Sequence, residues 1–133
     1  MATKDLGRAR RDDPATMTAV TALDHRGVER LRAGSFDAAA SFFRQALALD
    51  PTAYRPLANL ALVLQQQNDL SEAFRALAKA VDLKPRDPML HMQMGQLLVK
   101  ANRGEEALRA YRNVLGLDPT LAQAWCGVLA AAR

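Results

Sequence analysis

The amino-acid sequence aligns with itself when it is shifted by 34 residues. Two columns of the alignment hold small residues, a third holds large apolar residues, and a fourth holds proline. The aligned residues are Gly27, Ala61 and Gly95; Ala39, Ala73 and Ala107; Phe43, Leu77 and Tyr111; and Pro51, Pro85 and Pro119. A fixed period of this length is typical of stacked-repeat proteins, in which each unit buries its apolar face only against its neighbours. The period therefore predicts an array of repeated units.

Each unit is expected to be a pair of helices, because its apolar residues recur at helical spacing. Asp13-Pro14 predicts the first helix start, and Gly34 predicts the end of that helix. A second helix is expected from Phe36 until Asp50-Pro51 stops it, since proline disfavours helix in the residue before it. Further helices are expected near residues 53–67, 70–83, 88–101 and 104–117, with a trailing helix over about 121–132.

The turns within the pairs and the small-residue columns have physical causes. Asn68 and Asn102 take the place of Gly34, because Asn tolerates the left-handed backbone that ends many helices. Side chains of one carbon or none let the two helix axes of a pair approach closely. The resulting prediction is an all-α solenoid of three helix pairs, with repeats at about 20–53, 54–87 and 88–121.

Composition agrees with one soluble domain. Half of the 133 residues are hydrophobic, which is enough for one continuous core over residues 14–133. Residues 1–13 are polar and aperiodic, so we expect a flexible tail. A single cysteine, Cys126, excludes an internal disulfide and fits a reducing compartment. No run approaches the roughly 18 apolar residues of a membrane span, so the expected location is the cytoplasm, without membrane insertion.

The net charge of +4 raises the question of nucleic-acid binding. Such binding needs basic residues concentrated on one face. Several basic residues instead lie in the second halves of predicted helices, where they complement the helix dipole: Arg44, Arg75, Lys79, Arg109 and Arg112. The one cluster is Arg8, Arg10 and Arg11, and acidic residues interrupt it. The charge pattern therefore favours a solvated, slightly basic surface over a nucleic-acid partner.

Patterns for catalysis or cofactor binding are missing from the sequence. His25, His91 and Cys126 are far apart and do not form a metal-ligand pair at the usual spacing. A nucleophile with an activating base is not indicated, and there is no glycine-rich phosphate loop. We expect no enzyme activity, no cofactor and no metal.

The repeated columns resemble the tetratricopeptide repeat. Its pattern is Leu, then Gly or Ala, then Ala, an aromatic residue, Ala and Pro, and all three units follow it at most positions. The departures are Arg26 and Met94 for Leu, Leu77 for the aromatic residue and Val114 for Ala. The residues of the pattern are Gly27, Ala39, Phe43, Ala46 and Pro51; Leu57, Leu60, Ala61, Ala73, Leu77, Ala80 and Pro85; and Met94, Gly95, Ala107, Tyr111, Val114 and Pro119. Trp125 stands where a fourth unit would begin, so the trailing helix resembles the first half of a fourth unit, and we expect it to follow the three pairs as a C-terminal capping helix.

The resemblance implies a right-handed superhelix whose first helices line a concave groove that binds peptides or protein segments. The family's groove positions fall on residues of all three first helices. The candidate binding residues are Asp24, His25, Arg55, Asn59, Leu62, Met89, Gln93 and Gln96.

Three residues at the predicted groove positions have more than one interpretation. The Asn59 amide offers a donor and an acceptor, so it could hold a peptide backbone, or it could be a merely solvated polar group. Met89 and Met92 could form an adaptable apolar patch for a partner. For Met92, packing between repeats is the favoured interpretation.

One subgroup of the family holds the terminal carboxylate of chaperone tails with a set of lysine, asparagine and arginine side chains. The corresponding residues here are Asp24, Val28, Asn59, Met89 and Gln93. Only Asn59 matches, so the sequence argues against a co-chaperone of that type.

The leading hypothesis is a protein–protein interaction module: an adaptor, scaffold or chaperone-like protein. The alternative is the targeting region of a longer enzyme, such as a glycosyl- or methyltransferase. The alanine-rich C-terminal segment lacks the polar outer face expected of a terminal cap. This segment predicts either a continuing array or contact between two copies through the last helix.

Overall fold

A computed structural model gives the structure of the protein and describes residues 14–121. These residues form helices joined by short turns and contain no strand. The helices are α2 (Pro14–Arg32), α3 (Phe36–Leu49), α4 (Tyr54–Gln66), α5 (Leu70–Leu83), α6 (Pro88–Lys100) and α7 (Gly104–Leu117). The predicted all-α fold is confirmed, and each of these helices begins and ends close to the bounds that the sequence predicted. The N-terminal tail, Asp13, Cys126 and the trailing helix lie outside the described residues.

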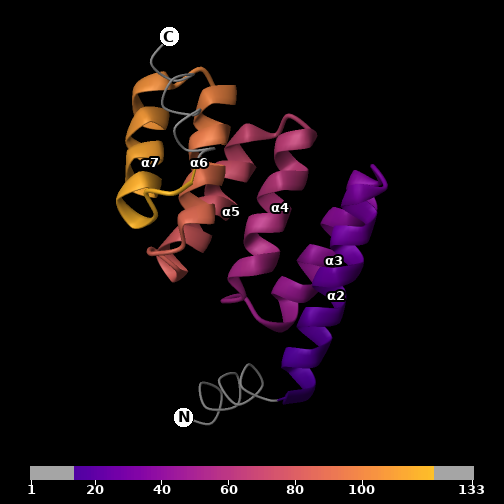
Figure 1. The fold of residues 1–133 in the computed structure, drawn as a ribbon. Coiled ribbons are helices and arrows are strands. Elements are labelled where there is room, and N and C mark those ends of the chain that lie inside the picture. The colour runs from indigo at the N-terminus through magenta and orange to yellow at the C-terminus, as the bar shows by residue number, and fades with distance from the viewer. Residues whose placement is uncertain (1–13, 122–133) are drawn as a thin grey trace, which may run out of the picture.

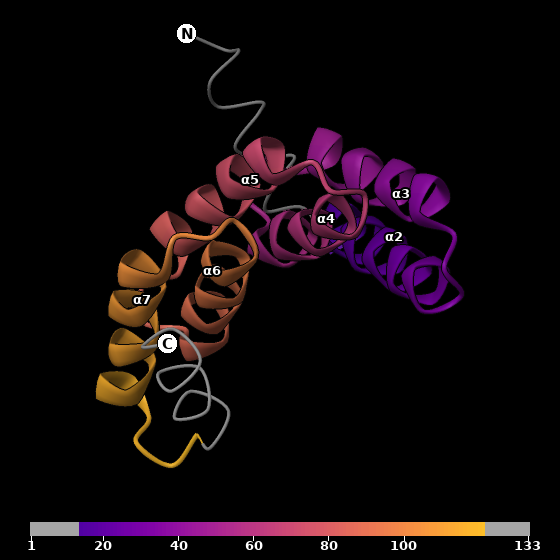
Figure 2. The same cartoon turned by 90° about the horizontal axis from the view of Figure 1, so that it is seen from above.

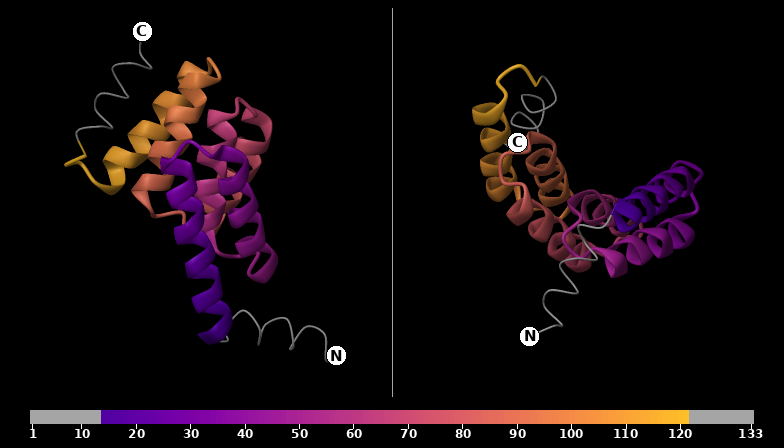
Figure 3. Two further views of the ribbon diagram at one scale, coloured as in Figure 1. Left: turned by 90° about the vertical axis from the view of Figure 1, so that its right-hand side faces the viewer. Right: turned by 90° about the horizontal axis from the view of Figure 1, so that it is seen from below.

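The helices stack in chain order as three antiparallel pairs: α2 with α3, α4 with α5, and α6 with α7 (Figure 1). Viewed from above, the pairs follow an arc, with α3, α5 and α7 on its outside and α2, α4 and α6 on its inside (Figure 2). The view from below shows the same order (Figure 3). The first helix of every pair therefore contributes to one concave side, as the resemblance to the tetratricopeptide repeat implied.

The turn within each pair has the same left-handed backbone. The dihedral φ is 79° at Gly34 and 63° at both Asn68 and Asn102. After each of these residues, a backbone N–H reaches back to the last turn of the preceding helix, as in Asp69 N donating to Leu64 O at 2.8 Å. This bond satisfies a carbonyl group that the helix end would otherwise leave without a partner. The Asn-for-Gly substitution therefore preserves the turn, as expected.

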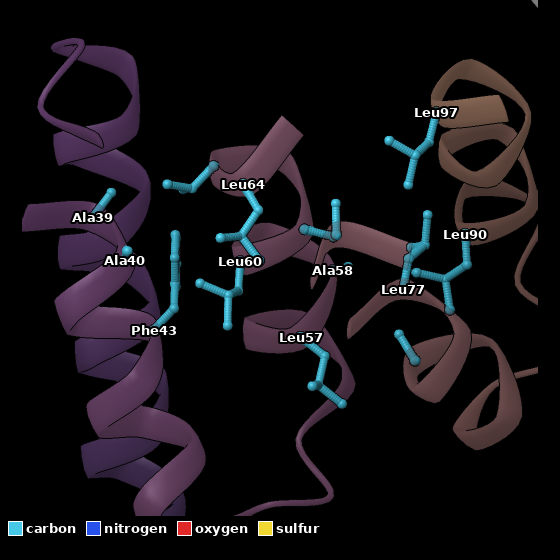
Figure 4. Packing of buried hydrophobic residues seen from close by; sticks show 14 residues of the cluster. Ala39, Ala40, Phe43, Leu57, Ala58, Leu60, Leu64, Leu77, Leu90 and Leu97 are labelled. Carbon is cyan, nitrogen blue, oxygen red and sulfur yellow. The ribbon is translucent and has the colours of Figure 1, made fainter. Parts of the chain in front are cut away.

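The main hydrophobic core runs through the first two pairs and into α6 (Figure 4). It is built from closely packed alanines and leucines together with Phe43, and Ala39, Phe43 and Ala73 are fully buried. A second cluster around Met92 and Tyr111 fills the third pair. Phe74 and Met94 pack against both clusters, so apolar packing continues from one pair to the next.

Polar contacts also connect successive pairs. Gln67 Nε2 donates to Asp37 Oδ1 at 2.7 Å, joining the first pair to the second. Lys100 Nζ donates to the backbone oxygen of Gln65 at 2.8 Å, joining the second pair to the third. Gln65 lies in the last turn of α4, where a cation complements the partial negative charge of the helix end. Successive pairs are thus fixed relative to one another beyond their apolar contacts.

Candidate partner-binding groove

The concave side has an open depression between its first two helices. Its volume is about 290 Å³, and we call it the Asp24 depression. Its walls come from α2, from the turn after α3 and from the first turn of α4. The lining residues are Met17, Val20, Thr21, Asp24, Asp50, Ala53, Tyr54, Arg55 and Pro56. Apolar side chains dominate the walls, and the charged groups are two carboxylates and one guanidinium.

Asp24 is buried, with 6% of its surface exposed, and it is the only charged residue among the described ones that is buried to this degree. Asn59 Nδ2 donates a hydrogen bond to Asp24 Oδ1 over 2.8 Å. Because an ionised carboxylate only accepts hydrogen bonds, the amide group must turn its nitrogen toward Asp24. The carbonyl oxygen and the second N–H of Asn59 are left for other partners.

Arg55 is an exposed residue at the start of α4, next to Tyr54 in the chain. The Tyr54 side chain raises the pKa of Arg55, and the carboxylates of Asp24 and Asp87 add smaller effects in the same direction. The Tyr54 ring also contacts Lys84, whose Nζ lies 5.5 Å from the ring centroid. One cation therefore lies over the π face of Tyr54 at the rim of the depression.

The other predicted groove residues do not line the Asp24 depression. His25 lines an adjoining depression along α2 with Thr18 and Ala22, and the two depressions share Met17 and Thr21. Leu62 and Gln93 are half-buried, and Gln96 is exposed. Met89 exposes 52% of its surface at the start of α6, so its thioether is open to solvent. The structure thus brings together Asp24, Arg55 and Asn59 and leaves the other five candidates spread over α2, α4 and α6.

Met92 and His91 have packing roles. Met92 exposes only 2% of its surface within the second cluster, which confirms the favoured interpretation of packing between repeats. His91 Nε2 lies 2.7 Å from the backbone oxygen of Pro85, so its ring closes the turn that precedes α6. Neither residue contributes an accessible group to the concave side.

Part of the depression wall is not predicted by the repeat pattern. Tyr54 and Pro56 stand outside the repeated columns, and the pattern assigns Asp50 only to a helix end. Asp50 Oδ1 accepts hydrogen bonds from Thr52 N at 3.0 Å and Thr52 Oγ1 at 2.7 Å, which fixes the turn that forms one rim. Asp118 and Thr120 form the same turn after α7. The recurring Asp-Pro-Thr sequence is the signal that could have indicated this rim.

Two further observations concern chemistry and membranes. Within residues 14–121, no three His, Cys, Asp or Glu side chains are grouped so that they could hold a metal ion. Across the same range, no helix combines the length and the apolar character needed to cross a membrane.

The fold and its concave side define an α-solenoid of helix–turn–helix repeats. The tetratricopeptide repeat model matches residues 30–97 and 64–132, which together cover most of the chain. The chain belongs to the tetratricopeptide repeat family, as the resemblance of its repeated columns implied.

Several curated relatives match part of the chain. A TPR repeat-containing protein of Treponema pallidum is 36% identical over 84 residues, which are 63% of this chain and 10% of that protein. The peroxisomal targeting signal receptor of Saccharomyces cerevisiae is 29% identical over 49% of this chain and 11% of its own length. Human protein O-mannosyl-transferase TMTC1 is 33% identical over 50% of this chain and 8% of its own length. The matches span about a tenth of each relative.

Solved structures share the fold over most of the chain. The first TPR of Spaghetti (RPAP3), bound to the HSP90 peptide SRMEEVD, superposes with a TM-score of 0.82 at 20% identity, covering 86% of this chain and 91% of that one. The O-GlcNAc transferase of Thermobaculum terrenum gives a TM-score of 0.83 at 24% identity, covering 90% of this chain and 23% of the transferase. At these identities the likeness shows the fold alone.

Proposed function

We propose that the protein is an interaction module that binds an extended segment of a partner protein along its concave side. The observation that carries this proposal is the Asp24 depression, where apolar walls flank Asp24 and Arg55 and where Asn59 donates a hydrogen bond to Asp24. A few oriented polar groups in an apolar recess can fix the position of a bound segment, while the apolar walls supply contact area. The family fold supports the same conclusion, since related proteins include a peptide-bound domain and a targeting-signal receptor.

Arg55 and Asn59 are proposed to contact the partner together with the exposed Met89. Arg55 lies at the rim of the depression, where its exposed guanidinium can reach a partner. Asn59 keeps an acceptor and a donor that match a peptide group. Gln93 and Gln96 would extend the polar contacts along α6, with His25 on α2 and Leu62 on α4.

An affinity pull-down from extracts of the source organism tests this function. The wild type is compared with Arg55→Ala and with Arg75→Ala, a matched control on outer helix α5 that is highly exposed and paired only with Glu72. Proteins retained by the wild type and by Arg75→Ala should be lost with Arg55→Ala. An identical set of proteins on all three baits would contradict binding at the concave side.

A second candidate is the targeting region of a longer transferase. It is favoured by the partial coverage of an O-mannosyl-transferase and an O-GlcNAc transferase, in which the matching segment is a small share of the enzyme. Sequencing the gene on both sides of the codons for residues 1–133 tests it. A transferase domain continuous with these residues would support this candidate, and its absence would leave the chain as a separate adaptor.

A further inference from the structure

The negative charge of the Asp24 carboxylate is balanced only by a hydrogen bond from an uncharged group. It is buried, and its hydrogen bond comes from the uncharged amide of Asn59. The two ion pairs among residues 14–121 join Arg75 to Glu72 and Arg103 to Glu106, far from this site in the chain. Burying a charge is costly unless it is paired with an opposite charge. A complete site would therefore place a cation beside Asp24.

The nearby cation of the chain does not form an ion pair with Asp24. Arg55 lines the same depression, but its side chain is exposed, and neither of the two ion pairs within residues 14–121 joins it to Asp24. Asp50, the other lining carboxylate, accepts two hydrogen bonds from Thr52. The depression thus contains a buried carboxylate that has no ion-pair partner among the described residues.

Resting on the proposed function, we infer that the Asp24 depression receives a lysine or arginine side chain from the bound partner segment. The cationic head would lie against Asp24, and its aliphatic stem would lie on the apolar wall formed by Met17, Val20 and Pro56. Long basic side chains favour such sites, because the stem gains apolar contact while the head reaches a polar group. The partner is therefore a protein segment with a basic anchor residue.

Selection of peptides from a phage-displayed library of random dodecapeptides on the full chain tests this inference. Enrichment of lysine or arginine at one position is expected. The most enriched peptide is then synthesised with a fluorescein label, together with a copy in which the basic residue is glutamine. Affinities of both peptides are measured by fluorescence anisotropy for the wild type, Asp24→Asn and Asp82→Asn.

Asp24→Asn removes the charge and keeps an oxygen that can accept the Asn59 hydrogen bond. Asp82→Asn makes the same change in net charge at an exposed residue of α5 that does not line the depression. Asp24→Asn should weaken binding of the basic peptide at least about tenfold and leave the affinity for the glutamine peptide unchanged. Asp82→Asn should bind both peptides like the wild type, and thermal melts should show that both variants fold.

Four results would overturn the inference. Selected peptides without a basic preference, or equal effects of Asp24→Asn and Asp82→Asn, would contradict the basic anchor and leave the proposed function intact. Failure of every peptide to bind the wild type would contradict the proposed function and therefore also the inference that rests on it. A tenfold gain in affinity after replacement of the N-terminal Arg8, Arg10 and Arg11 by Gln would assign the site to the chain's own arginines.

Discussion

The ring of Phe43 fills the space that a side chain on Gly27 would occupy, since a Cβ there would lie 2.4 Å from Phe43 Cε1. Gly95 has the same relationship to the ring of Tyr111, at 2.7 Å from Cζ. In the middle pair the corresponding residues are Ala61 and Leu77, and both are buried. Glycine therefore faces an aromatic ring, whereas alanine occurs where the facing residue is leucine. Two columns of the repeat vary together to keep the helix pair at close contact.

Gly27→Ala should destabilise the protein, although alanine favours helix by about 1 kcal/mol over glycine. Phe43 is fully buried and cannot move aside without disturbing the core, and overpacking of this kind costs about 1–3 kcal/mol. The net loss should reach up to about 2 kcal/mol in urea unfolding. Gly116→Ala is the control, because its added Cβ meets nothing within 4 Å. Equal free energies of unfolding for Gly27→Ala and Gly116→Ala would contradict the close contact between Gly27 and Phe43.

The double variant Gly95→Ala/Tyr111→Leu should be more stable than the sum of its single changes. It installs in the third pair the Ala and Leu combination that the second pair carries at Ala61 and Leu77. The Gly95→Ala change alone meets the aromatic ring, and Tyr111→Leu alone leaves a void beside glycine. A coupling free energy of about 0.5–3 kcal/mol is expected from a double-mutant cycle. Simple additivity would show that the two residues do not share this space.

Asn59→Ala should lower the free energy of unfolding by about 1–3 kcal/mol, because it leaves the buried Asp24 carboxylate without its amide donor. Gln93→Ala is a matched control one repeat later, where Ala58 takes the place of Asp24. Gln93→Ala should change stability by less than about 0.5 kcal/mol. Equal melting temperatures for the two variants would show that the Asp24–Asn59 bond contributes nothing to stability.

Asn68→Gly should leave stability nearly unchanged, and Asn68→Ala should cost about 1 kcal/mol. The reason is the left-handed φ of 63°, which glycine adopts freely and which the Cβ of alanine disfavours. Asn102 has the same backbone and should respond in the same way. Chemical denaturation of the two Asn68 variants provides the measurement, and equal stabilities would be inconsistent with this turn.

Tyr111 should make the protein less stable in alkali. Burial raises the pKa of the Tyr111 phenol above its ordinary value of 10.0, so the unfolded chain releases this proton at lower pH than the folded one. Stability from this group is complete below the unfolded pKa and is lost as pH rises through the folded value. Unfolding free energies of the wild type and Tyr111→Phe, measured between about pH 8 and 11, should show the steeper decline in the wild type. Parallel curves would contradict the prediction.

The sequence could predict the helices because their signals are local. Helical spacing of apolar residues, Pro51 and Pro85 at helix ends, and Asn68 in the turn act within a few residues of the chain. Which helices share the concave side was implied by the resemblance to the tetratricopeptide repeat. The family's groove positions, carried onto the repeat register, assign the candidate residues to α2, α4 and α6.

The sequence could not predict the environment of each candidate residue. Asp24 and Asn59 are 35 residues apart, and their contact depends on the rotation between successive pairs and on side-chain conformation. His25 adjoins Asp24 in the chain but lines another depression, since neighbouring residues on a helix face different directions.

By itself, the sequence determined the helix pairs and their repetition, because repeated local signals specify repeated local structure, and its resemblance to the tetratricopeptide repeat implied the common side of the first helices. The tertiary structure alone decided that Asp24 is buried and that Asn59 is its donor. Those relationships follow from how one pair is rotated on the next, and packing between residues distant in sequence sets that rotation.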